Sequence, residues 1–142
     1  MTVQLTPQIS VSPQILPEDI PALAAAGFGM IINNRPDGES AGQPLGAAIE
    51  AAARAAGMSY VTIPVDQSGI DPGMIKAMAD AMAAAKGPVL AYCRSGTRST
   101  HLWALAAASQ GADVVGVVRA AGDAGYDIQM MTPMLRQLNG AK

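Results

Sequence analysis

The stretch "VLAYCRSGTRSTHLWALAAA", residues 89–108, combines three patterns that together decide the fold. A short apolar run ends just before Cys93, a polar loop with a glycine follows, and an alanine-rich run typical of a helix comes after the loop. Because short apolar runs alternating with helical segments are typical of parallel sheets, we predict a central strand over 87–92. Cys93 is then expected at the carboxyl edge of the sheet, where open α/β folds bind their ligands.

The same alternation continues along the rest of the chain. We predict further strands over 8–12, 29–34 and 59–65, and helices over 18–26, 45–57, 73–86, 99–111 and 133–139. Residues 112–124 are ambiguous, because their valines favour a strand whereas Asp113 as a cap and the alanines favour a helix; we predict a helix. The sequence thus predicts a single α/β domain over 1–142, with a mainly parallel central sheet of four to five strands flanked by helices.

Composition excludes several classes of function. A formal charge of −2 and a pI near 5.1 provide no basic field for nucleic acid. No apolar run approaches the ~20 residues of a membrane span, and no targeting segment is recognisable, so we expect a cytoplasmic protein without membrane contact. One cysteine and one histidine exclude an internal disulfide and a structural zinc site, and we expect neither metal nor cofactor.

The loop "CRSGTRS", residues 93–99, has the construction of a site for a small anion. Backbone N–H groups can turn inward there, the following helix presents its positive end, and Arg98 can close the ring. The same donors favour a thiolate, so we predict Cys93 as the nucleophile and Arg98 as its catalytic partner. The residues predicted to bind the substrate in this loop are Arg94, Ser95, Gly96, Thr97 and Ser99. A buried structural thiol is the commonest state of a free cysteine, but two arginines and a glycine within five residues favour catalysis.

Single residues of this region have competing interpretations. Arg94 either contacts the substrate or is a solvated surface charge, and Ser99 either assists the leaving thiolate or caps the helix. His101 and Trp103 are interpreted as packing or surface residues, not as catalytic groups.

Three motifs resemble a known family: "GFGMIINNRPDGE" (27–39), "YVTIPV" (60–65) and "GPVLAYCRSGTRSTHLWALAA" (87–107). Together they are similar to the phosphatase-like family of beta-lactamase hydrolase-like proteins, a bacterial branch of the cysteine phosphatases, over about residues 9–130. The resemblance implies a fold like that of the dual-specificity phosphatases, with Cys93 as nucleophile and Arg98 as anion-binding arginine. It also implies sulfide-oxidising or persulfide-handling enzymes as partners, because relatives of this module occur fused to them.

The loop departs from the phosphatase pattern in two places. Cysteine phosphatases carry histidine before the cysteine and five residues between cysteine and arginine, whereas Tyr92 precedes Cys93 and four residues separate Cys93 from Arg98. This spacing is similar to that of single-domain rhodaneses, which carry a persulfide, and a tighter ring suits one terminal sulfur better than a tetrahedral phosphate. We favour persulfide sulfur transfer; the alternatives are a phosphatase that forms a thiophosphate on Cys93 and a non-catalytic module that senses anions.

Two other loops carry candidate polar residues. Asp66 follows a predicted strand where phosphatases keep a general acid, and it is either that acid or a solvated loop residue, whereas Asp71 is predicted as a helix cap. Arg35 and Asp37 flank a predicted turn, and the resemblance raises the expectation that Arg35 or Asp37 borders the substrate pocket.

Overall fold

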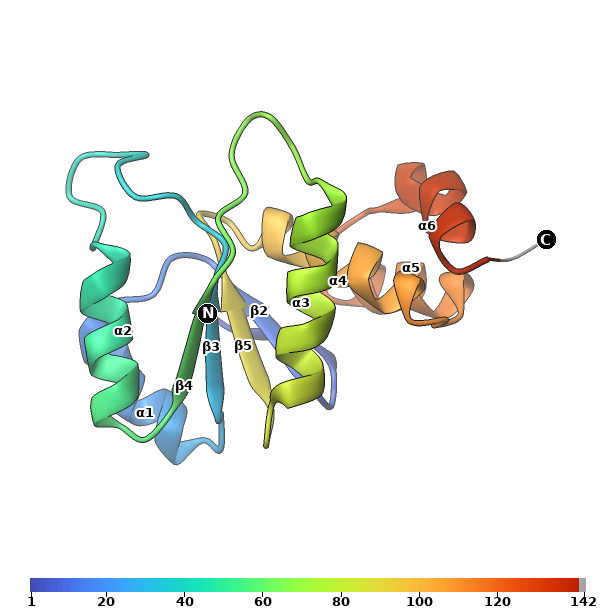
Figure 1. Cartoon of the computed structure of the whole chain (residues 1–142). Coiled ribbons are helices and arrows are strands. Elements are labelled where there is room, and N and C mark those ends of the chain that lie inside the picture. Colours follow the sequence, from blue (N-terminus) through green and yellow to red (C-terminus); the bar gives the residue numbers. More distant parts are fainter. Residues whose placement is uncertain (141–142) are drawn as a thin grey trace.

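A five-stranded sheet forms the centre of the structure, a computed structural model that describes residues 1–140 (Figure 1). The strands are β1 (Val3–Thr6), β2 (Ile9–Ser12), β3 (Met30–Asn33), β4 (Ser59–Thr62) and β5 (Val89–Tyr92). They lie in the order β1-β2-β5-β3-β4, in which only β1 is antiparallel to its neighbour. The predicted single-domain α/β fold with a mainly parallel sheet is therefore confirmed.

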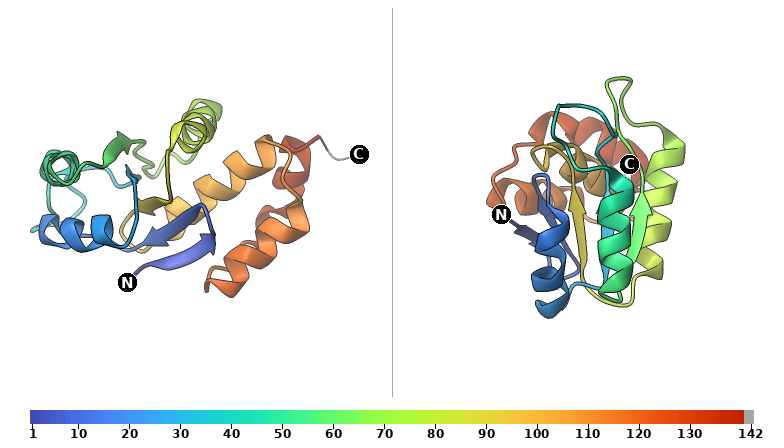
Figure 2. Two further views of the ribbon diagram at one scale, coloured as in Figure 1. Left: turned by 90° about the horizontal axis from the view of Figure 1, so that it is seen from below. Right: turned by 90° about the vertical axis from the view of Figure 1, so that its left-hand side faces the viewer.

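Helices cover both faces of this sheet (Figures 1 and 2). They are α1 (Ile20–Ala25), α2 (Gly46–Ala55), α3 (Pro72–Ala84), α4 (Thr97–Ser109), α5 (Val114–Asp123) and α6 (Thr132–Leu138), with short 3-10 turns η1 (Pro17–Asp19) and η2 (Gln129–Met131). α1 and α2 lie on one face, and the larger core under α3 and α4 lies on the other. Among residues 1–140, no helix is long and apolar enough to cross a membrane.

The ambiguous segment before η2 is a helix, as predicted. Asp113 caps α5, since its side chain accepts a hydrogen bond of 3.0 Å from the N–H of Gly116. The cap satisfies one of the free N–H groups of the first turn, so it outweighs the strand preference of the valines that follow.

Strand β5 is buried on both faces, as its continuous apolar run predicts. Val89 and Ala91 point into the larger core, whereas Leu90 and Tyr92 point into the smaller core near α1 and α2. The two flanking strands, β2 and β3, pair with β5 in parallel, so all three end at the same edge of the sheet. Cys93 follows β5 directly and therefore lies at that edge.

Most predicted elements differ from the structure by one to three residues at their ends, and three differences bear on the sheet or the site. β1 was not predicted, because Leu5 is its one buried residue and the segment carries little apolar alternation. The third predicted strand is shorter than expected and ends at Thr62 as β4. α4 begins at Thr97, two residues before the predicted start, because Gly96 adopts the non-helical conformation that begins it.

Candidate active site

The Cys93 thiol lies where β5 meets the amino end of α4. Its side chain is fully buried, and its backbone N–H donates to the carbonyl of Ser12 at 3.3 Å, which ties the loop to β2. The N–H of Gly96 donates to the Cys93 sulfur at 3.1 Å. The sulfur is thus held by a backbone donor beside the positive end of a helix, as the predicted anion site requires.

Glycine is required at position 96 for two reasons. Gly96 has a φ of +89°, which favours glycine, and a Cβ at this position would overlap the hydroxyl of Tyr126. Tyr126 follows α5 and its hydroxyl donates to the carbonyl of Ser95 at 3.0 Å. Burial raises the pKa of the Tyr126 phenol, and the charge of Cys93 adds to this rise. Tyr126 therefore contacts the cysteine loop from a distant part of the chain.

Arg98, in the first turn of α4, is fixed by two other loops. Its guanidinium donates to both carboxylate oxygens of Glu39, at 2.6 and 2.8 Å, and to the carbonyl of Val65 at 2.7 Å. The hydrogen bonds to Glu39 raise the pKa of Arg98 against an opposing effect of burial, and the charge of Cys93 adds to the rise. Arg98 thus stays cationic next to the thiol, as an anion-binding arginine must.

Glu39 connects Arg98 to a second, buried arginine. Arg35 is 5% exposed and donates to Glu39 at 2.9 Å, to Gln14 at 3.0 Å and to Ser40 at 3.1 Å. The hydrogen bond from Arg98, followed by that from Arg35, lowers the pKa of Glu39 to about 2 despite some burial. Glu39 is therefore a carboxylate at neutral pH. Each of the three guanidinium nitrogens of Arg35 donates a hydrogen bond to a protein group, and one of these bonds goes to Glu39.

The predicted general acid, Asp66, lies beside the site as an exposed carboxylate. It accepts hydrogen bonds from the N–H and the hydroxyl of Ser68, at 2.8 and 2.5 Å, and these lower its pKa. A carboxyl group with a lowered pKa is deprotonated at neutral pH, which does not favour proton donation. Asp71 caps α3 through the N–H of Met74 at 2.8 Å, which confirms the predicted cap.

The remaining predicted loop residues have distinct surroundings. The buried Ser99 hydroxyl donates to Asn34 at 2.8 Å, and the helix cap is Gly96, not Ser99. Arg94 is exposed, and the hydroxyl of Ser95 donates to that of Thr97 at 3.0 Å.

A cavity of about 330 Å³ opens on one side of Arg98. Its walls are largely apolar and include Met131 in η2, Met134 in α6 and Leu105 on α4. Asp66 and His101 also line it, and burial lowers the pKa of His101. Within residues 1–140, no group of three or more histidine, cysteine or acidic side chains is arranged to hold a metal ion. Arg98 is the residue that the cysteine loop contributes to the lining of this cavity, so the cavity adjoins the loop on the side of the arginine.

Cys93 and Arg98 are the residues for which the sequence predicts catalytic roles, whereas it assigns none to Glu39 or Tyr126. No local pattern marks Glu39, because its partner Arg98 lies 59 residues away. The one signal for Tyr126 was an aromatic residue in a loop of a chain that contains only 4% aromatics.

A family model and several relatives match the chain. The model of the beta-lactamase hydrolase-like protein, phosphatase-like domain, matches residues 2–111. The beta-lactamase hydrolase-like protein of Agrobacterium fabrum is 43% identical over 109 residues, which make up 77% of this chain and 25% of that protein. The chain spans between 25% and 32% of the length of the curated relatives that it matches.

Solved structures have the same fold. A candidate phosphatase from Neisseria meningitidis is 32% identical with a TM-score of 0.81, and the match covers 96% of each chain. Human DUSP28 is 17% identical with a TM-score of 0.69, covering 98% of this chain and 96% of that one, and this likeness concerns the fold alone.

Proposed function

The chain belongs to the phosphatase-like domain family of beta-lactamase hydrolase-like proteins, and from this premise we propose that it transfers sulfane sulfur through a persulfide on Cys93. The observation that carries the proposal is the short ring between Cys93 and Arg98, with four intervening residues and the Gly96 N–H directed at the sulfur. A ring of this size offers few donors for the three oxygens of a phosphate, whereas one terminal sulfur needs few.

The proposed reaction is a pair of displacements at sulfur. The Cys93 thiolate attacks the outer sulfur of thiosulfate, the S–S bond breaks, and sulfite leaves with the electron pair. An external thiolate, cyanide or sulfite then attacks the outer persulfide sulfur, and Cys93 leaves as a thiolate. Because the chain has one cysteine, no second thiol within it can resolve the persulfide.

The surroundings of the thiol support the roles of the other residues in this proposal. Arg98 stabilises the anionic part of the donor, and the Gly96 N–H stabilises the thiolate. Arg35 and Glu39 position the Arg98 guanidinium. In this proposal, an apolar group of an organic sulfane donor occupies the cavity that is lined by Leu105, Met131 and Met134. No step needs a proton from Asp66, which is consistent with its lowered pKa.

A phosphatase is the second candidate, and the 32% identity to the Neisseria meningitidis candidate phosphatase favours it. In that reaction Cys93 attacks phosphorus, the ester oxygen leaves with a proton from Asp66, and water hydrolyses the thiophosphate. A non-catalytic anion-sensing module would form neither adduct.

Intact-mass spectrometry separates the three functions. The protein is incubated with thiosulfate and, separately, with para-nitrophenyl phosphate, and Cys93→Ser serves as the control for the site of modification. We expect one added sulfur atom after thiosulfate, absent from Cys93→Ser and removed by cyanide. An added phosphate group with no sulfur adduct from any sulfane donor would overturn the proposal in favour of the phosphatase.

A further inference from the structure

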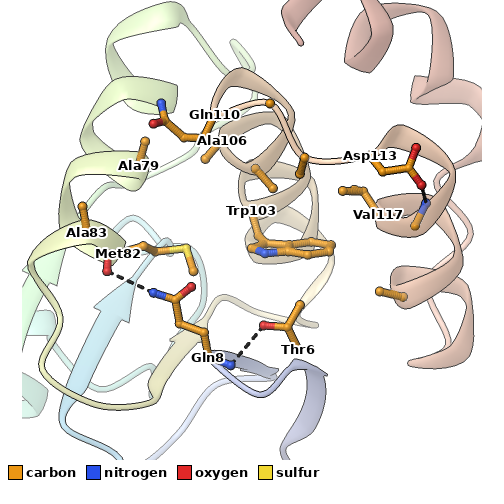
Figure 3. Close-up of a pocket in the computed structure, with 15 residues that line it drawn as sticks. Thr6, Gln8, Ala79, Met82, Ala83, Trp103, Ala106, Gln110, Asp113 and Val117 are labelled. Carbon is orange, nitrogen blue, oxygen red and sulfur yellow. Dashed lines mark hydrogen bonds between the residues drawn. The ribbon is translucent and has the colours of Figure 1, made fainter.

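A groove of about 630 Å³ lies at the end of α4 remote from Cys93 (Figure 3). Gln8, which lines it, precedes β2, and its carbonyl accepts from the N–H of Val89 at the start of β5. The groove is thus at the amino edge of the parallel strands, whereas Cys93 follows their carboxyl edge. It shares no lining residue with the cysteine loop and is a separate site.

Trp103 provides an unpartnered donor in this groove. The side chain is 3% exposed and Figure 3 shows its indole ring between α3 and α5 in the lining of the groove. Within residues 1–140, the indole N–H of Trp103 has no hydrogen-bond partner in the protein. Every side-chain nitrogen or oxygen there that is fully sealed from solvent does have a partner, so the indole nitrogen must be accessible to solvent. Because Trp103 lines the groove, the groove provides that access. A tryptophan side chain that is buried to this degree usually places its N–H on an acceptor. No protein group among residues 1–140 supplies one to Trp103, so a ligand in the groove can fill that position.

The other walls define the chemistry of that ligand. Small side chains, among them Ala79, Ala83 and Ala106, leave apolar space around the indole. Asp113 is the one charged residue of the lining, and its carboxylate already caps α5. Without a cation in the lining, an anionic ligand would be desolvated without compensation.

We propose that this groove binds a neutral, apolar small molecule whose carbonyl-type oxygen accepts a hydrogen bond from Trp103. Its volume is within the range of small-molecule sites, which combine apolar walls with few polar groups. The amide of Gln8, whose nitrogen donates to the carbonyl of Met82 at 3.1 Å, is held at the rim.

Trp103 is the only tryptophan of the chain, so its fluorescence reports binding directly. The full chain is titrated with 2-octanone, a neutral ketone, and with octanoate, an anion of the same chain length. We expect a saturable fluorescence change with 2-octanone and binding of octanoate at least tenfold weaker. Thiosulfate should not displace 2-octanone, because the two sites are separate. The absence of saturation, or equal binding of both probes, would overturn the proposal.

A pair of neighbouring variants then locates the site. Ala83 and Ala84 are both exposed on α3, but only Ala83 lines the groove. We expect Ala83→Leu to weaken 2-octanone binding about tenfold and Ala84→Leu to leave it within twofold. Trp103→Phe, followed by calorimetry, should weaken binding about threefold to tenfold by removing the donor. Equal affinities of Ala83→Leu and Ala84→Leu would place the ketone elsewhere and contradict the assignment.

Discussion

Glu39 and Arg98 form a two-pronged ion pair, with hydrogen bonds of 2.6 and 2.8 Å, although 59 residues separate them in the sequence. Such a pair fixes the plane of the guanidinium as well as its position. The buried Arg35 holds the same carboxylate from behind at 2.9 Å, so the orientation of Arg98 beside Cys93 depends on a loop from another part of the chain. Glu39 is therefore a positioning residue for the proposed anion-binding arginine.

Glu39→Gln should impair the reaction through Arg98. The neutral amide offers one acceptor oxygen in place of two charged ones, so we expect kcat/KM for thiosulfate to fall about tenfold, with most of the change in KM. Glu50→Gln is the matched control, because it removes an exposed ion pair with Arg54 of 2.8 Å remote from the thiol. The kcat and KM of both variants are measured in steady-state assays with thiosulfate as donor and cyanide as acceptor. Equal losses of kcat/KM in the two variants would show that Glu39 has no specific role.

The same ion pair predicts how stability depends on pH. The pKa of Glu39 is about 2 in the folded chain and 4.5 when unperturbed, so its contribution is complete above about pH 4.5 and is lost as pH falls through 2. We expect about 1 kcal/mol, because a side chain that is 25% exposed is partly screened. Urea unfolding at pH 7, 4 and 3 should show the difference between wild type and Glu39→Gln shrinking with acidity. A constant difference would contradict this linkage.

Local sequence patterns predicted the part of the site that is continuous in the chain. The run ending at Cys93, the glycine at position 96 and the helix after it belong to one segment, whose apolar period and loop composition are readable without tertiary contacts. Arg98 belongs to the same segment, five positions after Cys93, and the two side chains interact electrostatically in the structure.

The rest of the site depends on contacts between distant segments, which such patterns do not encode. Glu39 lies in a polar loop, and nothing local distinguishes it from the solvated acid of a turn. Tyr126 contacts Ser95 from 31 residues away. β1 was missed for a related reason, since its pairing with β2 buries only Leu5.

Tyr126 should control access to the thiol. Cys93 has no exposed surface, and the Tyr126 hydroxyl bonds to Ser95 beside it. We expect Tyr126→Ala to raise the rate of alkylation of Cys93 by iodoacetamide about tenfold, measured by intact mass. Tyr126→Phe keeps the ring and removes one hydrogen bond, so its rate should stay within about threefold of wild type. Slower alkylation of Tyr126→Ala than of wild type would show that the ring organises the loop and does not cover it.

Asp66→Asn distinguishes the two candidate reactions. Sulfur transfer needs no proton donor, so thiosulfate turnover should stay within twofold, whereas a phosphatase would lose alkyl phosphate hydrolysis far more than nitrophenyl phosphate hydrolysis. Ser68→Ala is the companion variant, because removing the hydroxyl that bonds to Asp66 should move the pKa of that carboxyl back toward its ordinary value. A tenfold loss of thiosulfate turnover in Asp66→Asn would contradict its assignment as a bystander.

Loop length should select the chemistry, and a one-residue insertion tests this directly. Inserting a glycine between Gly96 and Thr97 restores the phosphatase spacing of five residues between Cys93 and Arg98. It adds a backbone donor but moves the start of α4 away from the Gly96 N–H that now bonds to the sulfur at 3.1 Å. We expect thiosulfate turnover to fall at least tenfold while vanadate, which mimics the phosphoryl transition state, binds more tightly. An insertion between Gly57 and Met58, remote from the cysteine loop, should change neither property. If wild type already binds vanadate as tightly as the insertion variant and hydrolyses phosphomonoesters at Cys93, the short ring does not exclude phosphate.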